Sequence, residues 1–144
     1  GGIVVGTNDL AKELVLPKQT GRAGLLYALG SIILTAKAYN VITLDGVFNG
    51  ISDEEGLRSE AEEGKNMGYD GKTLIHPNQI GITNAVFSPT EKEIDLANKI
   101  IEAYEKAKEE KSGVTTVDGV LVEELHVKQS LALISKMKMI QSMS

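Results

Sequence analysis

The chain has 144 residues, 42% of them hydrophobic and 24% charged, which is the composition of an ordinary globular domain. A formal net charge of −5 argues against a nucleic-acid-binding protein, because such proteins present a basic surface. The lack of cysteine excludes disulfides, thiolate zinc sites and cysteine nucleophiles. No apolar run reaches the length of a membrane span, and no N-terminal signal pattern is seen. We therefore expect a cytoplasmic or organelle-matrix α/β protein with no nucleic-acid or membrane partner.

The first half of the chain is predicted to alternate between strands and helices. Short apolar runs rich in β-branched residues predict buried strands over 3–6, 41–48 and 72–75. Apolar residues at three- and four-residue spacing, together with start signals, predict helices over 25–36, 52–67 and 77–87. Ser52 and Glu55 fit a capping box, and Pro77 suits the first turn of a helix. Alternation of this kind is typical of βαβ units, so we expect three adjacent parallel strands.

The second half of the chain is predicted to contain two helices joined by a hairpin. Thr90 and Glu93 fit a further capping box, which opens a long amphipathic helix. The Asp118-Gly119 pair is the signature of a two-residue turn, so residues 114–117 and 120–122 should pair as a hairpin. A final helix is predicted over 125–140.

The chain opens on two glycines and then directly on the apolar run Ile3-Val4-Val5. A natural domain rarely begins inside a core strand, so we expect the chain to be part of a longer protein. Three strands also cannot close a barrel, and they leave an open sheet.

Parallel α/β proteins place their chemistry at the carboxyl ends of the strands. The first predicted strand ends in Gly6-Thr7-Asn8-Asp9, whose amides can hold an anion and whose carboxylate can ligate a hard cation. The residues by themselves favour a simpler interpretation, in which Asp9 N-caps the turn over 10–14. His76 follows the third strand and fits an acid or base, but a histidine held by a backbone hydrogen bond is the favoured interpretation.

Several motifs, in order and correctly spaced between about residues 3 and 135, resemble a single family. They are Gly6-Thr7-Asn8-Asp9-Leu10-Ala11, Leu25-Leu26-Tyr27-Ala28, Glu55-Gly56-Leu57, the stretch from Gly68 to Ile80 (GYDGKTLIHPNQI), Phe87-Ser88-Pro89 and Gly119-Val120-Leu121-Val122-Glu123. The chain resembles the citrate lyase beta-subunit-like family, which holds malyl-CoA and citramalyl-CoA lyases among the HpcH/HpaI-type aldolases. The stretch over 68–80 is highly specific for it.

The resemblance implies a (β/α)8 barrel with a C-terminal extension. Residues 1–88 would form the last three strand–helix units of the barrel, and residues 89–144 would form the extension of long helix, hairpin and final helix. The first five units would be missing; in the family they supply a substrate-gripping arginine and a glutamate that binds the metal. A homotrimer is implied too, because the family's extension reaches into a neighbouring subunit's active site.

The implied activity is a Mg2+-dependent carbon–carbon lyase reaction on a 2-hydroxy-acid thioester of the citryl-, malyl- or citramalyl-CoA type. Its products would be a 2-oxo acid, or an oxaloacetate-like acid, and an acetyl thioester of CoA or of an acyl-carrier protein. Asp9 matches the second metal ligand of the family. The residues that would bind the substrate carboxylate are Gly6, Thr7, Asn8 and Asp9.

Two further sets of residues receive roles from the resemblance. Those that fall where the family packs the CoA thioester arm are Val47, Phe48, Ile75, His76 and Pro77. Glu123 takes the position of the family's catalytic aspartate, which handles a proton in a neighbouring subunit's site. The residues by themselves favour a solvated glutamate at the start of the final helix.

Three residues depart from the family pattern. Glu123 replaces the usual aspartate and is longer, Leu29 stands where the helix usually has arginine, and Gly50 stands where aspartate is usual. These departures indicate an altered or reduced activity, or another acyl chain. The alternative function is a non-catalytic homologue or fragment that serves as an assembly or binding piece.

Overall fold

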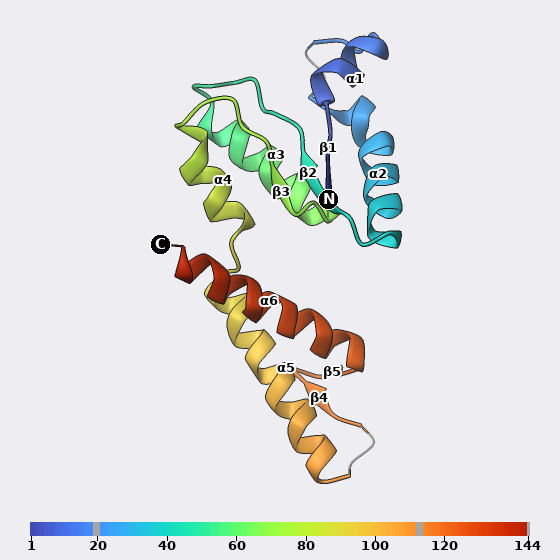
Figure 1. The fold of residues 1–144 in the computed structure, drawn as a ribbon, viewed down its shortest axis with the longest axis vertical. Coiled ribbons are helices and arrows are strands. Elements are labelled where there is room, and N and C mark those ends of the chain that lie inside the picture. The colour runs from blue at the N-terminus through green and yellow to red at the C-terminus, as the bar shows by residue number, and fades with distance from the viewer. Residues whose placement is uncertain (19–20, 112–113, 144) are drawn as a thin grey trace. The chain divides into compact units, whose positions relative to one another are not determined.

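The computed structural model describes residues 1–18, 21–111 and 114–143, which divide into two compact units, Gly1–Phe87 and Ser88–Ser144 (Figure 1). The first unit contains β1 (Gly2–Val4), α1 (Thr7–Glu13), a short 3₁₀ helix η1 (Ala23–Leu25), α2 (Leu26–Ala38), β2 (Ile42–Asp45), α3 (Glu54–Met67), β3 (Gly71–Lys72) and α4 (Gln79–Phe87). The second contains α5 (Glu91–Glu109), β4 (Thr116–Val117), β5 (Val120–Leu121) and α6 (Glu124–Ser142). Within these described ranges, no helix is long and apolar enough to cross a membrane.

The first unit is built on a parallel sheet in the order β1-β2-β3. Ile3 lies opposite Thr43 in the first strand pair, and Asp45 lies opposite Lys72 in the second. The connections between the strands carry helices, and α2 packs on β2 while α3 packs on β3 and α4. The prediction of three adjacent parallel strands is confirmed.

The strands are shorter than predicted. The prediction of a strand over 41–48 was wrong outside Ile42–Asp45, because the neighbouring strands end at Val4 and Lys72 and leave residues beyond Asp45 without a strand partner. The prediction over 72–75 was wrong beyond Lys72, where Ile75 donates its N–H to Gln79 Oε1 at 3.1 Å instead of to a strand.

The first strand is exposed, which contradicts its prediction as a buried strand. All three of its residues are exposed, including Val4 at 58%, and burial begins only at Val5. The reason is that β1 pairs with β2 along one edge and, in the part of the chain that the structure describes, with no strand along the other. An apolar composition makes a strand suited to burial, but β1 is an edge strand here and stays exposed.

The hydrophobic core of the first unit lies between the sheet and its helices. Its buried members come from the residue after β1, from η1 and α2, from α3 and the turn after it, and from α4; they are Val5, Leu25, Leu29, Ile33, Ala61, Tyr69, Val86 and Phe87. Leu29 is fully buried, and Tyr69 donates its hydroxyl to the Leu29 carbonyl at 3.1 Å. This hydrogen bond connects α2 to the turn after α3.

Two predicted helix caps were wrong by one or a few residues. Asp53, and not Ser52, caps α3, because its carboxylate accepts the Gly56 N–H at 2.9 Å. Gly6, and not Asp9, is the N-cap of α1, which places Asp9 within the first turn of that helix. The first turn still gains from the negative charge of Asp9, since the amino end of a helix carries a partial positive charge.

The second unit consists of α5 and α6 packed against each other, with the hairpin β4–β5 between them in sequence (Figure 1). The Thr90–Glu93 capping box is confirmed: Glu93 donates its N–H to Thr90 Oγ1 at 3.1 Å, and Thr90 donates its N–H to Glu93 Oε2 at 2.7 Å. The hairpin is confirmed as well, and its turn residues Asp118 and Gly119 both have positive φ, 50° and 79°. Such angles are what a two-residue turn of this kind requires.

Candidate functional site

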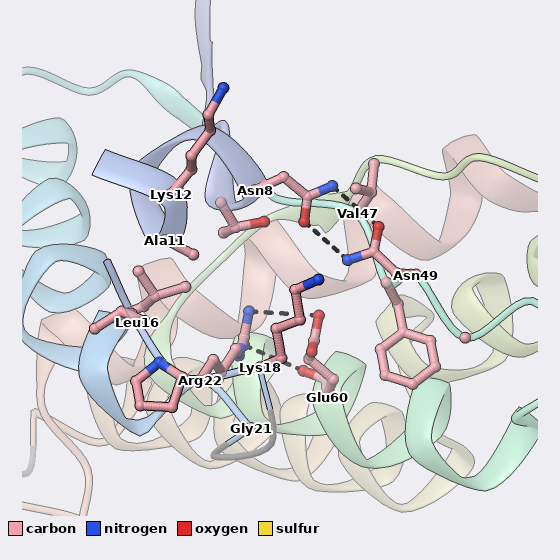
Figure 2. A pocket seen from close by; sticks show the side chains of 15 residues that line it. Asn8, Ala11, Lys12, Leu16, Lys18, Gly21, Arg22, Val47, Asn49 and Glu60 are labelled. Atoms are coloured by element: carbon pink, nitrogen blue, oxygen red, sulfur yellow. Dashed lines mark hydrogen bonds and ion pairs between the residues drawn. The ribbon is translucent and has the colours of Figure 1, made fainter. Parts of the chain in front are cut away.

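The carboxyl ends of β1 and β2 meet and are joined by a pair of asparagines. Asn8 Nδ2 donates to Asn49 Oδ1 at 3.0 Å, and Asn49 Nδ2 donates to Asn8 Oδ1 at 2.8 Å. Asn8 lies in the first turn of α1, and Asn49 lies in the loop after β2 (Figure 2). The two reciprocal hydrogen bonds hold the loops after neighbouring strands in a fixed relation, which is the edge of the sheet where the sequence predicts a site.

A cleft of about 630 Å³ opens beside this asparagine pair (Figure 2). It is lined by α1, the segment that follows it, the loop after β2 and one residue of α3; the lining residues are Thr7, Asn8, Ala11, Lys12, Leu16, Pro17, Lys18, Gly21, Arg22, Leu25, Val47, Phe48, Asn49, Gly50 and Glu60. The volume lies within the range usual for small-molecule sites. Four residues given roles by the family resemblance are brought together here: Thr7, Asn8, Val47 and Phe48.

Asp9 is exposed at the amino end of α1 and does not line the cleft. Its carboxylate lies over Gly6, since a Cβ built on Gly6 would be 3.5 Å from Asp9 Oδ2. The Thr7 amide is already engaged, because it donates to the Val5 carbonyl at 3.1 Å. Within residues 1–18, 21–111 and 114–143, no three histidine or acidic side chains cluster as metal ligands. Asp9 can therefore supply one oxygen ligand of a metal site, not a complete set.

The loop after β3 carries the remaining residues expected at the CoA arm. Ile75, His76 and Pro77 are exposed and do not line the cleft, and His76 Nδ1 accepts the Asn78 N–H at 3.3 Å. Buried Gln79 ties this loop to the previous one, because its Nε2 donates to the Phe48 carbonyl at 3.0 Å. The loops after β2 and β3 are thus connected, although only the first reaches the cleft.

A buried cluster of charges lies beneath the cleft, and sequence reasoning missed it. Asp45 is fully buried at the end of β2, where Arg22 Nη1 donates to both of its oxygens, at 2.7 and 2.8 Å. Lys72 Nζ lies 3.3 Å from Asp45 Oδ2 and 2.6 Å from Glu60 Oε1, while Arg22 Nε donates to Glu63 Oε1 at 2.6 Å. The cluster joins the segment after α1 to β2, β3 and α3.

Close packing and pKa shifts both follow from this cluster. A Cβ on Gly64 would lie 2.7 Å from Asp45 Oδ2, so glycine there allows α3 to approach the carboxylate. Burial by itself would lower the pKa of Arg22, but its hydrogen bonds to Asp45 and Glu63 outweigh burial and raise it. Burial, with the nearby negative charge of Asp45, raises the pKa of Tyr69 to about 12. Arg22 is therefore permanently charged, and its charge is committed to the cluster.

One sequence signal could have revealed the cluster. Asp45 and Lys72 are single charged residues within two short strand runs that were expected to be buried. A charge in such a position must be paired, because an unpaired buried charge costs several kcal/mol or more. Arg22 had no comparable signal, since it lies in an irregular segment whose place depends on the fold.

Glu123 belongs to the second unit, where it is the N-cap of α6 and is exposed. It donates its backbone N–H to His126 Nδ1 at 3.0 Å. The carboxylate is therefore carried at the start of the last helix, directly after the hairpin.

The family model described as HpcH/HpaI aldolase/citrate lyase matches residues 1–77, which is more than half of the chain. The chain belongs to this family. A (3S)-malyl-CoA thioesterase from Cereibacter sphaeroides is 52% identical over 134 residues, covering 91% of this chain and 47% of the relative. The chain thus spans about half the length of the curated relatives it matches.

Two solved structures illustrate the family fold. The citrate lyase beta subunit of Mycobacterium tuberculosis, complexed with oxaloacetate and magnesium, is 30% identical to this chain with a TM-score of 0.55. The match covers 61% of this chain and 42% of the M. tuberculosis chain. CitE of the same organism, complexed with magnesium, acetoacetate and coenzyme A, is 23% identical with a TM-score of 0.76, over 95% of this chain and 52% of its own. The chain has the α/β fold of these proteins, and its parallel sheet is consistent with part of a barrel.

The three residues that depart from the family pattern lie in different surroundings. Leu29 is a fully buried core residue of α2. A Cβ on Gly50 would lie 2.9 Å from Phe48 Cε1, so an aspartate there would displace the ring that lines the cleft. Glu123 is exposed at the start of α6. Two of the three departures thus shape the interior and the cleft wall, and the third changes the length of an exposed acid.

Proposed function

We propose that this chain is part of an enzyme that acts on the CoA thioester of a 2-hydroxy acid, with Mg2+ held in part by Asp9. The observation that carries the proposal is the position of Asp9, an exposed carboxylate that follows a parallel strand beside a ligand-sized cleft. Support also comes from the named relatives, which include a malyl-CoA thioesterase and a citrate lyase beta subunit complexed with magnesium. We place the enzyme in the cytoplasm or an organelle matrix.

Asp9 fits a magnesium ion as one ligand among several. Mg2+ usually binds one or two carboxylates and keeps other positions for water and substrate oxygens. When bound, the ion would polarise the substrate carbonyl and stabilise negative charge that develops on oxygen. The backbone amides of Gly6 and Asn8, together with the side chain of Thr7, would bind the substrate carboxylate beside it. The other acidic ligand would come from outside this chain.

The CoA thioester arm would lie along the loops after β2 and β3. Val47 and Phe48 line the cleft, and Gln79 connects their loop to Ile75 and its neighbours. We assign Val47, Phe48, Ile75, His76 and Pro77 to the arm, of which the first two would contact it within the cleft.

Two reactions of such a thioester are candidates. Cleavage of the carbon–carbon bond would give a 2-oxo acid and an acetyl thioester, as in a lyase. Attack of water on the thioester carbonyl would instead break the carbon–sulfur bond and release CoA with the intact hydroxy acid. The 52% identity to a malyl-CoA thioesterase favours hydrolysis, and the likeness to a citrate lyase beta subunit favours cleavage.

Substrates of the malyl-, citramalyl- and citryl-CoA type separate these reactions by their products. Release of free thiol without a 2-oxo acid would establish hydrolysis, and a 2-oxo acid with an acetyl thioester would establish the lyase. A folded, magnesium-binding protein that turns over none of them would support the non-catalytic assembly role instead.

The first prediction concerns Asp9. Asp9→Asn should abolish magnesium-dependent turnover, because a neutral amide is a much weaker ligand for a hard cation than a carboxylate. Circular dichroism should show an unchanged fold, since the side chain is exposed and is not the helix cap. Exposed Glu13 on the same helix supplies the control, and Glu13→Gln should retain activity. Near-wild-type activity of Asp9→Asn with Mg2+ would contradict the metal assignment.

Glu123 would act as an acid or base on the substrate of a neighbouring subunit. Its place after the hairpin, exposed on a separate compact unit, supports a role outside its own barrel part. The role requires an oligomer with shared sites, for which we propose the homotrimer that the family resemblance implies. A carboxyl group that becomes buried at such a site can have its pKa raised toward neutrality, which suits proton transfer.

A further inference from the structure

The cleft carries two positive charges that nothing else in the described structure balances. Its charged lining residues are Lys12, Lys18, Arg22 and Glu60. Arg22 is committed to Asp45 and Glu63, and Glu60 is bound by Lys72, so these two lining charges already have partners.

Lys12 and Lys18 differ from that pair. Both side chains are exposed, and neither makes an ion pair with residues 1–18, 21–111 or 114–143. Figure 2 shows the Lys18 amine directed, in that view, toward the side of the cleft with Asn49 and Glu60. In a chain whose net charge is −5, the cleft therefore has a local excess of two cations. A local excess of this kind favours an anionic ligand.

The rest of the lining indicates what the anion is attached to. Leu16, Leu25, Val47 and Phe48 give the cleft apolar walls, while the Asn8–Asn49 pair places amide groups at its edge. Such a lining suits an elongated molecule with both apolar and amide parts. The volume of about 630 Å³ is larger than a single carboxylate or phosphate ion needs.

We propose that Lys12 and Lys18 bind a phosphate group of the CoA nucleotide in this cleft. The inference rests on the proposed function, because the acyl end of the CoA thioester would lie at the Mg2+ held by Asp9, next in the chain to the cleft residue Asn8. The carboxylate of the acyl group would bind at the Mg2+ site, so the lysines would remain available for the phosphates at the other end of the CoA molecule. Lysine suits a phosphate because its ammonium is a compact point charge with three donors.

The test measures CoA binding without turnover, by calorimetry on the intact protein. Lys12→Gln and Lys18→Gln should each weaken CoA binding by roughly tenfold, the usual order for losing a charge-assisted hydrogen bond. The double variant should weaken it further, and wild-type affinity should fall steeply with salt. Lys99→Gln is the matched control, since this exposed lysine does not line the cleft.

Truncated ligands identify the group that is recognised. Pantetheine, which has no phosphate, should bind all variants equally. 4′-Phosphopantetheine and dephospho-CoA separate the diphosphate end from the ribose 3′-phosphate, and inorganic phosphate tests whether a free anion competes. Equal CoA affinity in the wild type and the double variant would overturn the proposal. An equal loss of pantetheine binding would do so as well, because the lysines would then act through something other than phosphate.

The same variants keep this proposal separate from the proposed reaction. Turnover of an acyl-CoA with an unchanged KM in the double variant would leave the enzyme assignment intact and reject the lysines. Lysine-dependent CoA binding without turnover of any substrate would support the lysines and reject the reaction. Absence of CoA binding to the folded wild-type protein would reject the lysine proposal.

Discussion

Asp45 is a buried carboxylate on which two cations converge. It is fully buried, and its two oxygens take hydrogen bonds from Arg22 and Gly46 and an ion pair from Lys72. The arrangement is specific, because removal of one member leaves a buried partner with fewer opposite charges than it needs. The cluster therefore holds the floor of the cleft and the strand ends together.

Asp45→Asn should lower the free energy of unfolding of the intact protein by about 3 kcal/mol. The neutral side chain removes the fully buried counter-charge of Arg22 and Lys72 and leaves them only the partly exposed carboxylates of Glu60 and Glu63. Urea unfolding measures the change, with Glu62→Gln, an exposed position on α3, as the control. A loss within about 1 kcal/mol, the range of exposed ion pairs, would show that the cluster relaxes when the charge is removed.

Asp70 gives the protein a pH-dependent contribution to stability. Burial would raise the pKa of its carboxyl, but the Thr43 N–H at 2.9 Å and the Lys37 amine at 3.0 Å outweigh burial and lower the pKa below its ordinary value of 3.8. The folded state therefore binds the proton more weakly than the unfolded state. The stabilisation is present above pH 3.8 and is lost as the pH falls through the folded pKa.

Asp70→Asn should accordingly flatten the dependence of unfolding free energy on pH in this acid range, compared with the wild type. The measurement is a series of urea unfolding curves from neutral pH downward. Asp95→Asn, at an exposed position of α5, should leave the dependence as it is. If Asp70→Asn and the wild type lose stability in parallel, the carboxylate contributes nothing to acid sensitivity.

The start of α3 lies one residue later than its capping motif predicts. Ser52 and Glu55 have the spacing of a capping box, but Asp53 takes the cap. The Asp53 side chain accepts the Gly56 N–H, and a Cβ on Gly56 would overlap that carboxylate. The glycine therefore allows the aspartate to reach back over the first turn.

Asp53→Ala should destabilise the protein by about 1 kcal/mol, the usual cost of losing an N-cap. Ser52→Ala is the matched change one position earlier, and it should have almost no effect because Ser52 is not the cap. Thermal unfolding of both variants under the same conditions provides the comparison. Equal losses would mean that the capping role is shared, and a larger loss for Ser52→Ala would restore the prediction from sequence.

Several large apolar side chains are exposed in the part of the chain that the structure describes. Ile42 is 58% exposed in the sheet, and Tyr27 and Leu34 of α2 are 90% and 76% exposed. The open edge of β1 is a further unpartnered feature, which a closed barrel would pair with another strand. We expect the chain to need further strands for full stability, from upstream residues or another chain.

A shared active site makes a further prediction. Asp9→Asn subunits and Glu123→Gln subunits should each be inactive by themselves, yet mixed assemblies should recover part of the activity. Recovery is expected because some mixed interfaces pair an intact Asp9 with an intact Glu123. The measurement is turnover after co-refolding at several ratios. If both variants are inactive and mixing restores nothing, Glu123 acts within its own chain; if Glu123→Gln is fully active, it does no chemistry.

Sequence patterns were enough to predict the order of strands and helices except for α1, which was expected only as a turn, and also the parallel sheet, the hairpin turn and the Thr90 cap. These features depend on local periodicity and on residues with strict backbone preferences, which is why short-range patterns were sufficient. The family motifs also predicted four residues that the structure brings to the cleft from α1 and the loop after β2, namely Thr7, Asn8, Val47 and Phe48.

Which charges are buried together, and which remain available to a ligand, depends on the tertiary structure. Asp45 is 23 residues from Arg22 and 27 residues from Lys72 in the sequence, so no local pattern links the three. The exposure of β1 was also beyond the sequence, because an apolar run shows that a strand is suited to burial without showing whether a neighbouring strand is present to bury it. Lys12 and Lys18 are distinguished from other exposed lysines for the same reason, since only the folded chain places them at one cleft.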